Sequence, residues 1–235
     1  MSSPGAQRCR EMLARNHRLA ERICAPGFCI DAFEHLQQWQ RHRLTESFSD
    51  LMALDSYRPA CDFFLAELYG GLDFLERDQD MEKVMHVMVR FLPNKTLLSL
   101  AGAFELQAVS LEFDMEMAEI MDSSNITSLE VAAYTSVYRR CGQRSKREIQ
   151  ILLIQRLGQD LARLMNKPLV AALVRLLRGP AHAAGFGKLQ EFLETGLSAF
   201  RELEDPDYFI DTIYQREWLT MQKLFAGNEN PFAGF

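Results

Sequence analysis

The chain has 235 residues, 48% of them hydrophobic, and a formal net charge of -6 at pH 7. This length and apolar content are enough to bury a sizeable core in one domain. The negative charge argues against a polyanion such as nucleic acid as the main partner. The five cysteines are odd in number and lack CxxC spacing, so neither a disulfide framework nor a zinc site is indicated.

No stretch of the sequence predicts secretion or membrane insertion. The N-terminal residues are too polar for a signal peptide, and the longest apolar run, residues 168–177, is short and interrupted by Arg175. We therefore expect a cytoplasmic protein with no membrane partner. Because no linker or solenoid repeat divides the chain, we predict one all-helical domain over residues 1–226 and a short tail at 227–235.

The first half of the chain predicts two helices that differ in character. Residues 4–23 read as a polar, charged helix that should lie on the surface. Residues 31–55 carry apolar side chains at helical spacing and predict one long helix. A break follows before Pro59, because the proline ring disfavours the helical conformation of the residue that precedes it.

The stretch from Cys61 to Pro93 is predicted to form the centre of the fold. It combines a short aromatic helix, a turn at Gly70-Gly71, and a second helix over residues 79–92. In that second helix most of the circumference is apolar, so it should be covered on nearly all sides.

The remaining chain predicts further helices and no strand. Asn94 begins a long helix to about Met121. Capping-box spacing predicts helices from Thr127 and from Ser145, and Asp205-Pro206 caps the last one. Helices after Pro168 and over 181–204 complete an all-α, single multi-helix bundle of about nine helices.

The predicted helix after Pro180 contains the first candidate site. His182, Gly185, Phe186 and Gly196 share one face, where two glycines either admit another backbone or leave room for a ligand. A histidine on such a face could bind a metal or haem, or act as an acid or base. A core histidine with satisfied ring nitrogens is the more common arrangement, and the sequence identifies no second polar group.

Charged residues supply three weaker candidates. Glu67, close to two phenylalanines, is a partly buried acid with little support for a catalytic role. A strip of four glutamates on the long helix could serve a di-metal site, but the chain has no Glu-x-x-His pair, so a solvated face is the better interpretation and no metal site is predicted. Basic residues around Gly142 could bind a phosphate or an acidic partner, or simply end a helix. The strip consists of Glu105, Glu112, Glu116 and Glu119, and the basic residues are Arg139, Arg140, Arg144, Lys146 and Arg147.

Four stretches of the sequence, FFLAELYG, DF, ERDQD and GPAHAAGFGKLQEFLETGLSAFREL, resemble an uncharacterised family of all-helical bacterial proteins. The resemblance covers roughly Cys61 to Gly227. It implies an all-α cytosolic protein and supplies no activity, cofactor or catalytic residue.

Three functions are consistent with these patterns. The leading hypothesis is a soluble, non-enzymatic binding or adaptor protein that uses a helical groove or patch to bind a protein or a small apolar ligand. The second is an oxidase or oxygenase whose metal or haem lies inside the bundle near His182. The third is a small-molecule sensor with an apolar pocket near Gly185 and Gly196. The motifs GxGxxG, GxxxxGK(S/T), HExxH and GxSxG are absent. The sequence leaves the cofactor unknown and does not decide whether the protein is an enzyme.

Overall fold

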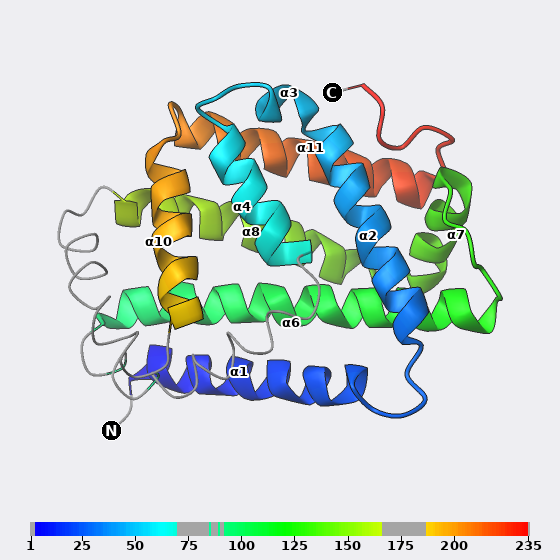
Figure 1. Cartoon of the computed structure of the whole chain (residues 1–235), viewed down its shortest axis with the longest axis horizontal. Coiled ribbons are helices and arrows are strands. Elements are labelled where there is room, and N and C mark those ends of the chain that lie inside the picture. The colour runs from blue at the N-terminus through cyan, green and yellow to red at the C-terminus, as the bar shows by residue number, and fades with distance from the viewer. Residues whose placement is uncertain (1–2, 70–84, 86–88, 90–91, 166–186, 235) are drawn as a thin grey trace.

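The protein is built from helices throughout its described part. A computed structural model describes residues 3–69, 85, 89, 92–165 and 187–234 (Figure 1). These residues form nine helices and no strand, so the predicted all-α class is confirmed. The helices are α1 (Pro4–Ile23), α2 (Ile30–Ser47), α3 (Ser49–Met52), α4 (Arg58–Tyr69), α6 (Asn94–Ser123), α7 (Val131–Cys141), α8 (Arg144–Met165), α10 (Gly187–Arg201) and α11 (Pro206–Ala226).

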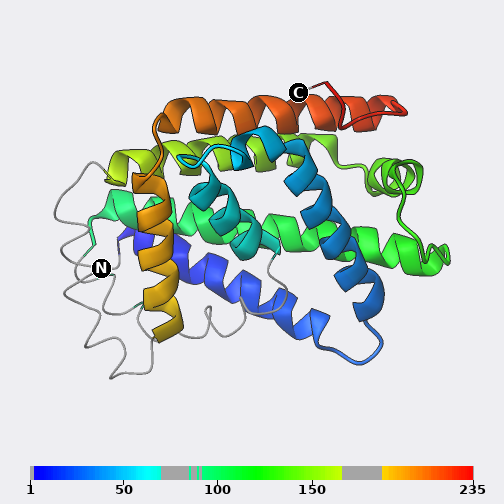
Figure 2. The same cartoon turned by 45° about the horizontal axis from the view of Figure 1, so that its top comes forward.

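Four long helices lie side by side in the order α11, α8, α6 and α1, and α2, α4 and α10 cross this layer (Figures 1 and 2). Side-chain contacts pair Ser99 with Asp160 and Ser110 with Gln150, so α8 runs antiparallel to α6. The 30-residue α6 contributes to three of the four buried apolar clusters among the described residues. It is therefore the central helix of the described structure.

The predicted centre at 79–92 falls mainly outside the described residues. Met85 is described there and is buried against α1 and α6. The helix predicted after Pro168 also lies outside the described residues.

Helix α1 has the predicted bounds and lies at the edge of the helix layer with one face exposed, as predicted, but the prediction did not include its buried face (Figure 1). Ser3 caps it, because its hydroxyl accepts a hydrogen bond from the backbone N-H of Ala6 at 3.3 Å. The apolar spacing of the sequence did not reveal this buried face, because half of its residues are small or polar and arginines lie between them. The buried residues are Gly5, Ala6, Cys9, Met12, Leu13, Asn16, Leu19 and Ile23.

The single helix predicted over 31–55 is interrupted at Phe48, whose φ of -119° and ψ of 20° are not helical. The guanidinium of Arg216 on α11 donates to the backbone oxygen of Ser47 at 2.8 Å and also pairs with Asp50 at 2.7 Å. This contact from a distant helix stabilises the carbonyl left free at the break. A periodicity argument within one segment could not detect it.

The last helix begins at its predicted cap and ends at a glycine. Asp205 accepts from the N-H of Tyr208 at 2.9 Å, and Gly227 ends the helix in the left-handed region with φ of 72°. The tail then returns, and the ring of Phe232 lies 5.7 Å from that of Trp39, measured between ring centroids. This contact holds the tail against α2, whereas Phe235 lies outside the described residues.

The predicted starts of two helices are wrong by a few residues. Helix α7 begins at Val131 rather than near Thr127, and Glu130 at its N-cap makes no capping side-chain hydrogen bond. Helix α8 begins at Arg144 rather than after Ser145. Capping-box spacing alone was therefore a poor guide to these boundaries.

Candidate functional site

The sequence-predicted ligand residues are only partly described. His182, Gly185 and Phe186 lie outside the described residues, as does the side chain of Glu67 on α4, so their roles stay predictions. Gly196 is buried on α10 and faces α4. A Cβ placed on it would lie 2.6 Å from Cζ of Phe63, so a phenyl ring occupies the space beside this glycine.

Gly196→Ala is expected to lower the free energy of unfolding by about 1–2 kcal/mol, because displacing the Phe63 ring outweighs the gain in helix propensity. Chemical denaturation measures the change. Gly102→Ala on α6 is the matched control, since its nearest outside atom, in Leu157, lies at 3.1 Å rather than 2.6 Å. Equal effects of the two substitutions would contradict the packing explanation.

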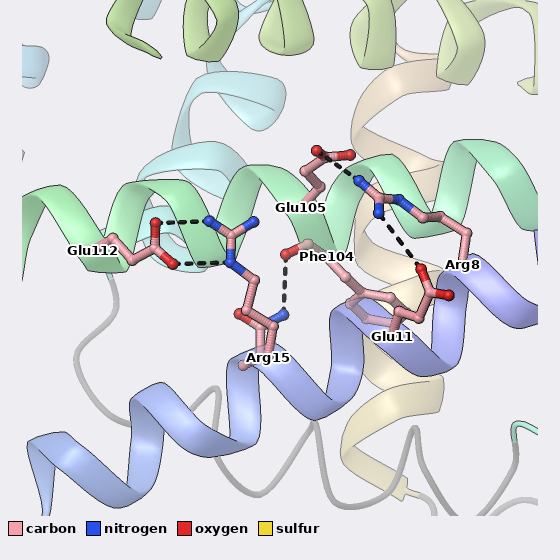
Figure 3. Close-up of polar contacts among 7 residues, drawn as sticks. Arg8, Glu11, Arg15, Phe104, Glu105 and Glu112 are labelled. Atoms are coloured by element: carbon pink, nitrogen blue, oxygen red, sulfur yellow. Dashed lines mark hydrogen bonds and ion pairs between the residues drawn. The ribbon is translucent and has the colours of Figure 1, made fainter. Parts of the chain in front are cut away.

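The acidic strip of α6 faces α1, and three of its four glutamates bind arginines there. Figure 3 shows two of these pairs, those of Glu105 and Glu112. The three glutamates are seven residues apart along α6, and the three arginines are seven residues apart along α1. The sequence separation within each arginine–glutamate pair is the same, so the two helices run parallel. The solvated interpretation is wrong for Glu105 and Glu112, whose side chains are 30% and 34% exposed and ion-paired. The pairs are Arg8–Glu105 at 2.9 Å, Arg15–Glu112 at 2.7 Å and Arg22–Glu119 at 3.5 Å.

We call these three ion pairs the ladder. Its middle pair, Arg15–Glu112, has the most specific geometry. Arg15 donates to the two carboxylate oxygens of Glu112, from Nε at 2.8 Å and from Nη2 at 2.7 Å. A two-point contact of this kind matches the planar fork of a guanidinium and cannot be reproduced by a lysine ammonium. The fourth glutamate, Glu116, instead accepts a hydrogen bond from the side-chain amide of Gln143, just before α8.

Beside the ion pairs, side chains of α1 reach the backbone of α6. The thiol of Cys9 donates to the carbonyl of Leu97 at 3.0 Å, and the amide of Asn16 donates to that of Phe104 at 3.0 Å. Burial raises the pKa of Cys9 to about 11, so its sulfur keeps the proton that it donates. These contacts are again seven residues apart on each helix, as expected for two helices packed in a heptad register.

The two helices approach each other closely near their N-terminal ends. The backbone N-H of Gly5 donates to Oδ1 of Asn94 at 2.8 Å. A Cβ on Gly5 would lie 2.8 Å from the backbone oxygen of Asn94, so a larger residue would push the helices apart. The ion pairs, the carbonyl contacts and this close approach together set one register for α1, and we call this contact surface the α1–α6 seam.

Asn16 is the polar exception inside the seam. Its residue is 1% exposed, and its Oδ1 has no hydrogen-bond partner within the described structure. A buried amide in a heptad contact specifies register at a cost in stability. The seam is therefore built for a defined alignment rather than for the greatest stability.

Asn16→Leu is expected to raise the free energy of unfolding by about 1 kcal/mol, because it removes a buried carbonyl oxygen without a partner. Thermal or chemical denaturation measures the gain. Gln7→Leu on the exposed side of α1 provides the control and should change stability little. A loss of stability in Asn16→Leu would show that the hydrogen bond to Phe104 outweighs the unpaired oxygen.

A surface pocket of about 340 Å³ opens at the C-terminal end of the seam. It lies over α6, between the end of α1 and the start of α8. Charged residues of both signs surround an apolar floor, and two ladder glutamates are among them. The lining residues are Arg22, Val109, Glu112, Phe113, Met115, Glu116, Glu119, Gln143 and Lys146.

On the other side of α6 a polar cluster is buried between helices. Asp114 is 5% exposed and accepts from the amide of Gln37 at 3.3 Å. Burial raises the pKa of Asp114 to about 6, against the opposing effects of Gln37, Arg147 and Gln40. The buried Arg147 guanidinium lies 3.6 Å from the centre of the Phe113 ring. This cluster joins α2, α6 and α8 through polar contacts.

The basic residues predicted around Gly142 do not converge. Arg147 points into the core, Arg140 donates to Ser124 at 2.8 Å, and Arg144 pairs with Glu148 at 3.1 Å. Lys146 lines the pocket. The arrangement therefore gives no common anion site for these four side chains.

Metal binding and membrane insertion can both be assessed for the part of the chain that the structure describes. No group of three or more histidine, cysteine, aspartate or glutamate residues in that part of the chain could hold a metal ion. None of the helices described is long and apolar enough to cross a membrane.

The fold and the seam define the protein as an all-α helical bundle whose central helix packs against the N-terminal one. Over residues 29–231 the chain matches the family described as a domain of unknown function (DUF8198), and it belongs to that family. The predicted membership of an uncharacterised family is thus confirmed. No match was found among curated proteins or solved structures. The matched residues begin after α1, so the α1–α6 seam pairs a helix within the matched region with one that precedes it.

Proposed function

We propose that the protein is a cytoplasmic, non-enzymatic helical binding or adaptor protein, and that it binds a partner helix on the face of α6 now covered by α1. The observation that carries this proposal is the α1–α6 seam. Within the family domain, α6 presents a face with the spacing, charges and carbonyl contacts needed to bind a helix. Its occupant, α1, precedes the matched residues.

The energetics of the seam suit exchange of one helix for another. Its ion pairs are partly exposed, and such pairs contribute only about 0.2–1 kcal/mol each. Burial of apolar side chains such as Leu13 and Leu97 supplies most of the stability. Since an amphipathic helix from another protein can bury similar side chains, it can compete for the same face.

The connection after α1 also suits this role. Residues Ala25, Pro26 and Gly27 are exposed, and Gly27 has φ of 93°. A tethered helix competes at a local concentration in the millimolar range, so a partner must bind more tightly or α1 must first be weakened. The tether would thus set a threshold for partner binding.

The proposal can be tested by cutting this connection in the folded protein. A protease site inserted between Ala25 and Phe28 would be cleaved, and a fluorescent peptide with the sequence of residues 3–24 would be added. We expect the peptide to replace the cleaved α1, giving a rise in anisotropy and a labelled protein peak in gel filtration. A peptide carrying Leu13→Asp should not exchange. Failure of the unaltered peptide to replace α1 would contradict the proposal.

The oxidase and sensor hypotheses depend on His182 and Gly185, which lie outside the described residues, and they stay predictions. Metal analysis and a visible absorption spectrum of the purified protein distinguish the first from a binding protein. Stoichiometric iron or a Soret band would contradict the adaptor proposal. A thermal shift with an apolar ligand would support a sensor.

A further inference from the structure

The chemistry of the seam also specifies what kind of helix it accepts. Resting on the proposed function, we infer that the partner is a basic amphipathic helix of another protein, with arginines seven residues apart, lying parallel to α6 in the register of α1. Three features of the seam carry this inference: its acidic edge, the two backbone carbonyls of α6 that accept hydrogen bonds from α1, and the close approach of the two helices at Gly5.

The acidic edge selects for positive charge. Glu105, Glu112 and Glu119 lie along one side of the α6 face at heptad spacing. Removing the α1 arginines would leave three carboxylates along the border of an apolar face. An acidic helix would be repelled there, whereas a helix with cations at the same spacing would be attracted.

The geometry of the middle pair favours arginine over lysine. Both oxygens of Glu112 are occupied by one guanidinium, at 2.8 Å and 2.7 Å. A lysine at this position keeps the charge but loses the two-point contact. Helix α6 should therefore prefer a partner with arginine over one with lysine at the central heptad position, although both residues carry the same charge.

The carbonyl contacts restrict the residue that follows each arginine. Cys9 and Asn16 come directly after Arg8 and Arg15, and each is a short side chain that donates to a backbone oxygen of α6. The third repeat, Arg22-Ile23, places a buried apolar residue at the same position. The expected partner motif is thus arginine followed by a short donor, repeated after seven residues, then arginine followed by an apolar residue.

The close approach at Gly5 fixes the direction of the partner. A residue without a side chain is required where the helix begins beside Asn94, because a Cβ would lie 2.8 Å from the backbone oxygen of that residue. A helix placed antiparallel would bring its C-terminal end to this point and its arginines out of step with the glutamates. Orientation and charge spacing are therefore specified together.

The inference is tested with the full chain carrying Leu13→Asp, which weakens α1, and with fluorescent 22-residue peptides. One peptide has the sequence of residues 3–24. Three variants replace Arg8, Arg15 and Arg22 by lysine, replace them by glutamate, or exchange each of them with the exposed residue that precedes it. Anisotropy titrations at low and high salt measure the affinities.

We expect the arginine peptide to bind most tightly, the lysine peptide about 10-fold more weakly, and the glutamate and shifted peptides on the order of 100-fold more weakly. Affinity for the arginine peptide should fall with added salt. A protein with Glu105, Glu112 and Glu119 changed to arginine should reverse the preference and select the glutamate peptide.

Other outcomes separate this inference from the proposed function. Equal affinity for all four peptides would overturn the charge selection while leaving α6 a helix-binding face. If the arginine peptide binds neither the Leu13→Asp protein nor the cleaved protein, the proposed function itself is overturned. Dimers of the wild-type protein in which α1 of one copy binds α6 of the other, detected by gel filtration, would overturn the inference of a separate partner.

Discussion

Leu13→Asp is expected to release α1 from α6 while the rest of the chain keeps its fold. Leu13 is 3% exposed and packs in the apolar cluster of the seam. A carboxylate there would be buried without a partner, which costs about 3–5 kcal/mol and exceeds what any one ladder pair contributes. Because α1 occupies the edge of the described helix layer and packs mainly on α6, its release leaves the packing among α6, α8 and α11 in place (Figure 1).

Hydrogen exchange followed by mass spectrometry measures this release. Peptides from α1 and α6 should lose protection, whereas peptides from α8 and α11 should keep it. Ala14→Asp is the matched control, since Ala14 is exposed on the same helix and its substitution should leave the seam intact. Uniform loss of protection across the chain would show instead that α1 is an inseparable part of the folding unit.

Asp114→Asn is expected to stabilise the protein above pH 6 and to flatten the dependence of stability on pH. In the wild-type protein burial raises the Asp114 pKa from an ordinary 3.8 to about 6, so the folded state holds this proton more tightly than the unfolded state. The contribution of Asp114 is therefore fully favourable below pH 3.8, and it is lost as the pH rises to about 6. The difference of about two pH units corresponds to about 3 kcal/mol.

Chemical denaturation of both proteins between pH 4 and pH 8 measures this effect. The difference in unfolding free energy should grow across that interval and then level off. Asp55→Asn, which changes an exposed carboxylate, is the control and should follow the wild type. A constant difference across the interval would contradict the raised pKa of Asp114, and a loss of stability at pH 8 would show that ionised Asp114 is needed by Gln37 and Arg147.

Much of the helical framework could be predicted from local patterns. The bounds of α1, the length of α6 and the cap at Asp205 follow from interactions within a few residues of chain, which a sequence displays directly. The break at Phe48 could not be predicted in this way, because the arginine that stabilises it comes from α11. The capping box predicted at Thr127 likewise does not mark the start of α7, which begins at Val131.

The candidate site was less accessible to sequence reasoning. The glutamate strip was visible as a heptad pattern, and so, in retrospect, were the arginines at 8, 15 and 22. Matching their spacing would have suggested the ladder, but each set was assigned to solvent because charged residues usually lie there. Gly196 was correctly placed on a packing face, yet only the structure shows that Phe63 fills the space beside it.

By itself the sequence determined an all-α protein, since apolar spacing and helix caps depend on neighbours along the chain. The tertiary structure decided which charged faces meet. Ion pairs between α1 and α6 join residues 97 positions apart, and a carboxylate looks the same in sequence whether water or an arginine faces it. The direction and register of α1, and hence the helix-binding face proposed for α6, depend on such contacts and became visible only when the two helices were placed side by side.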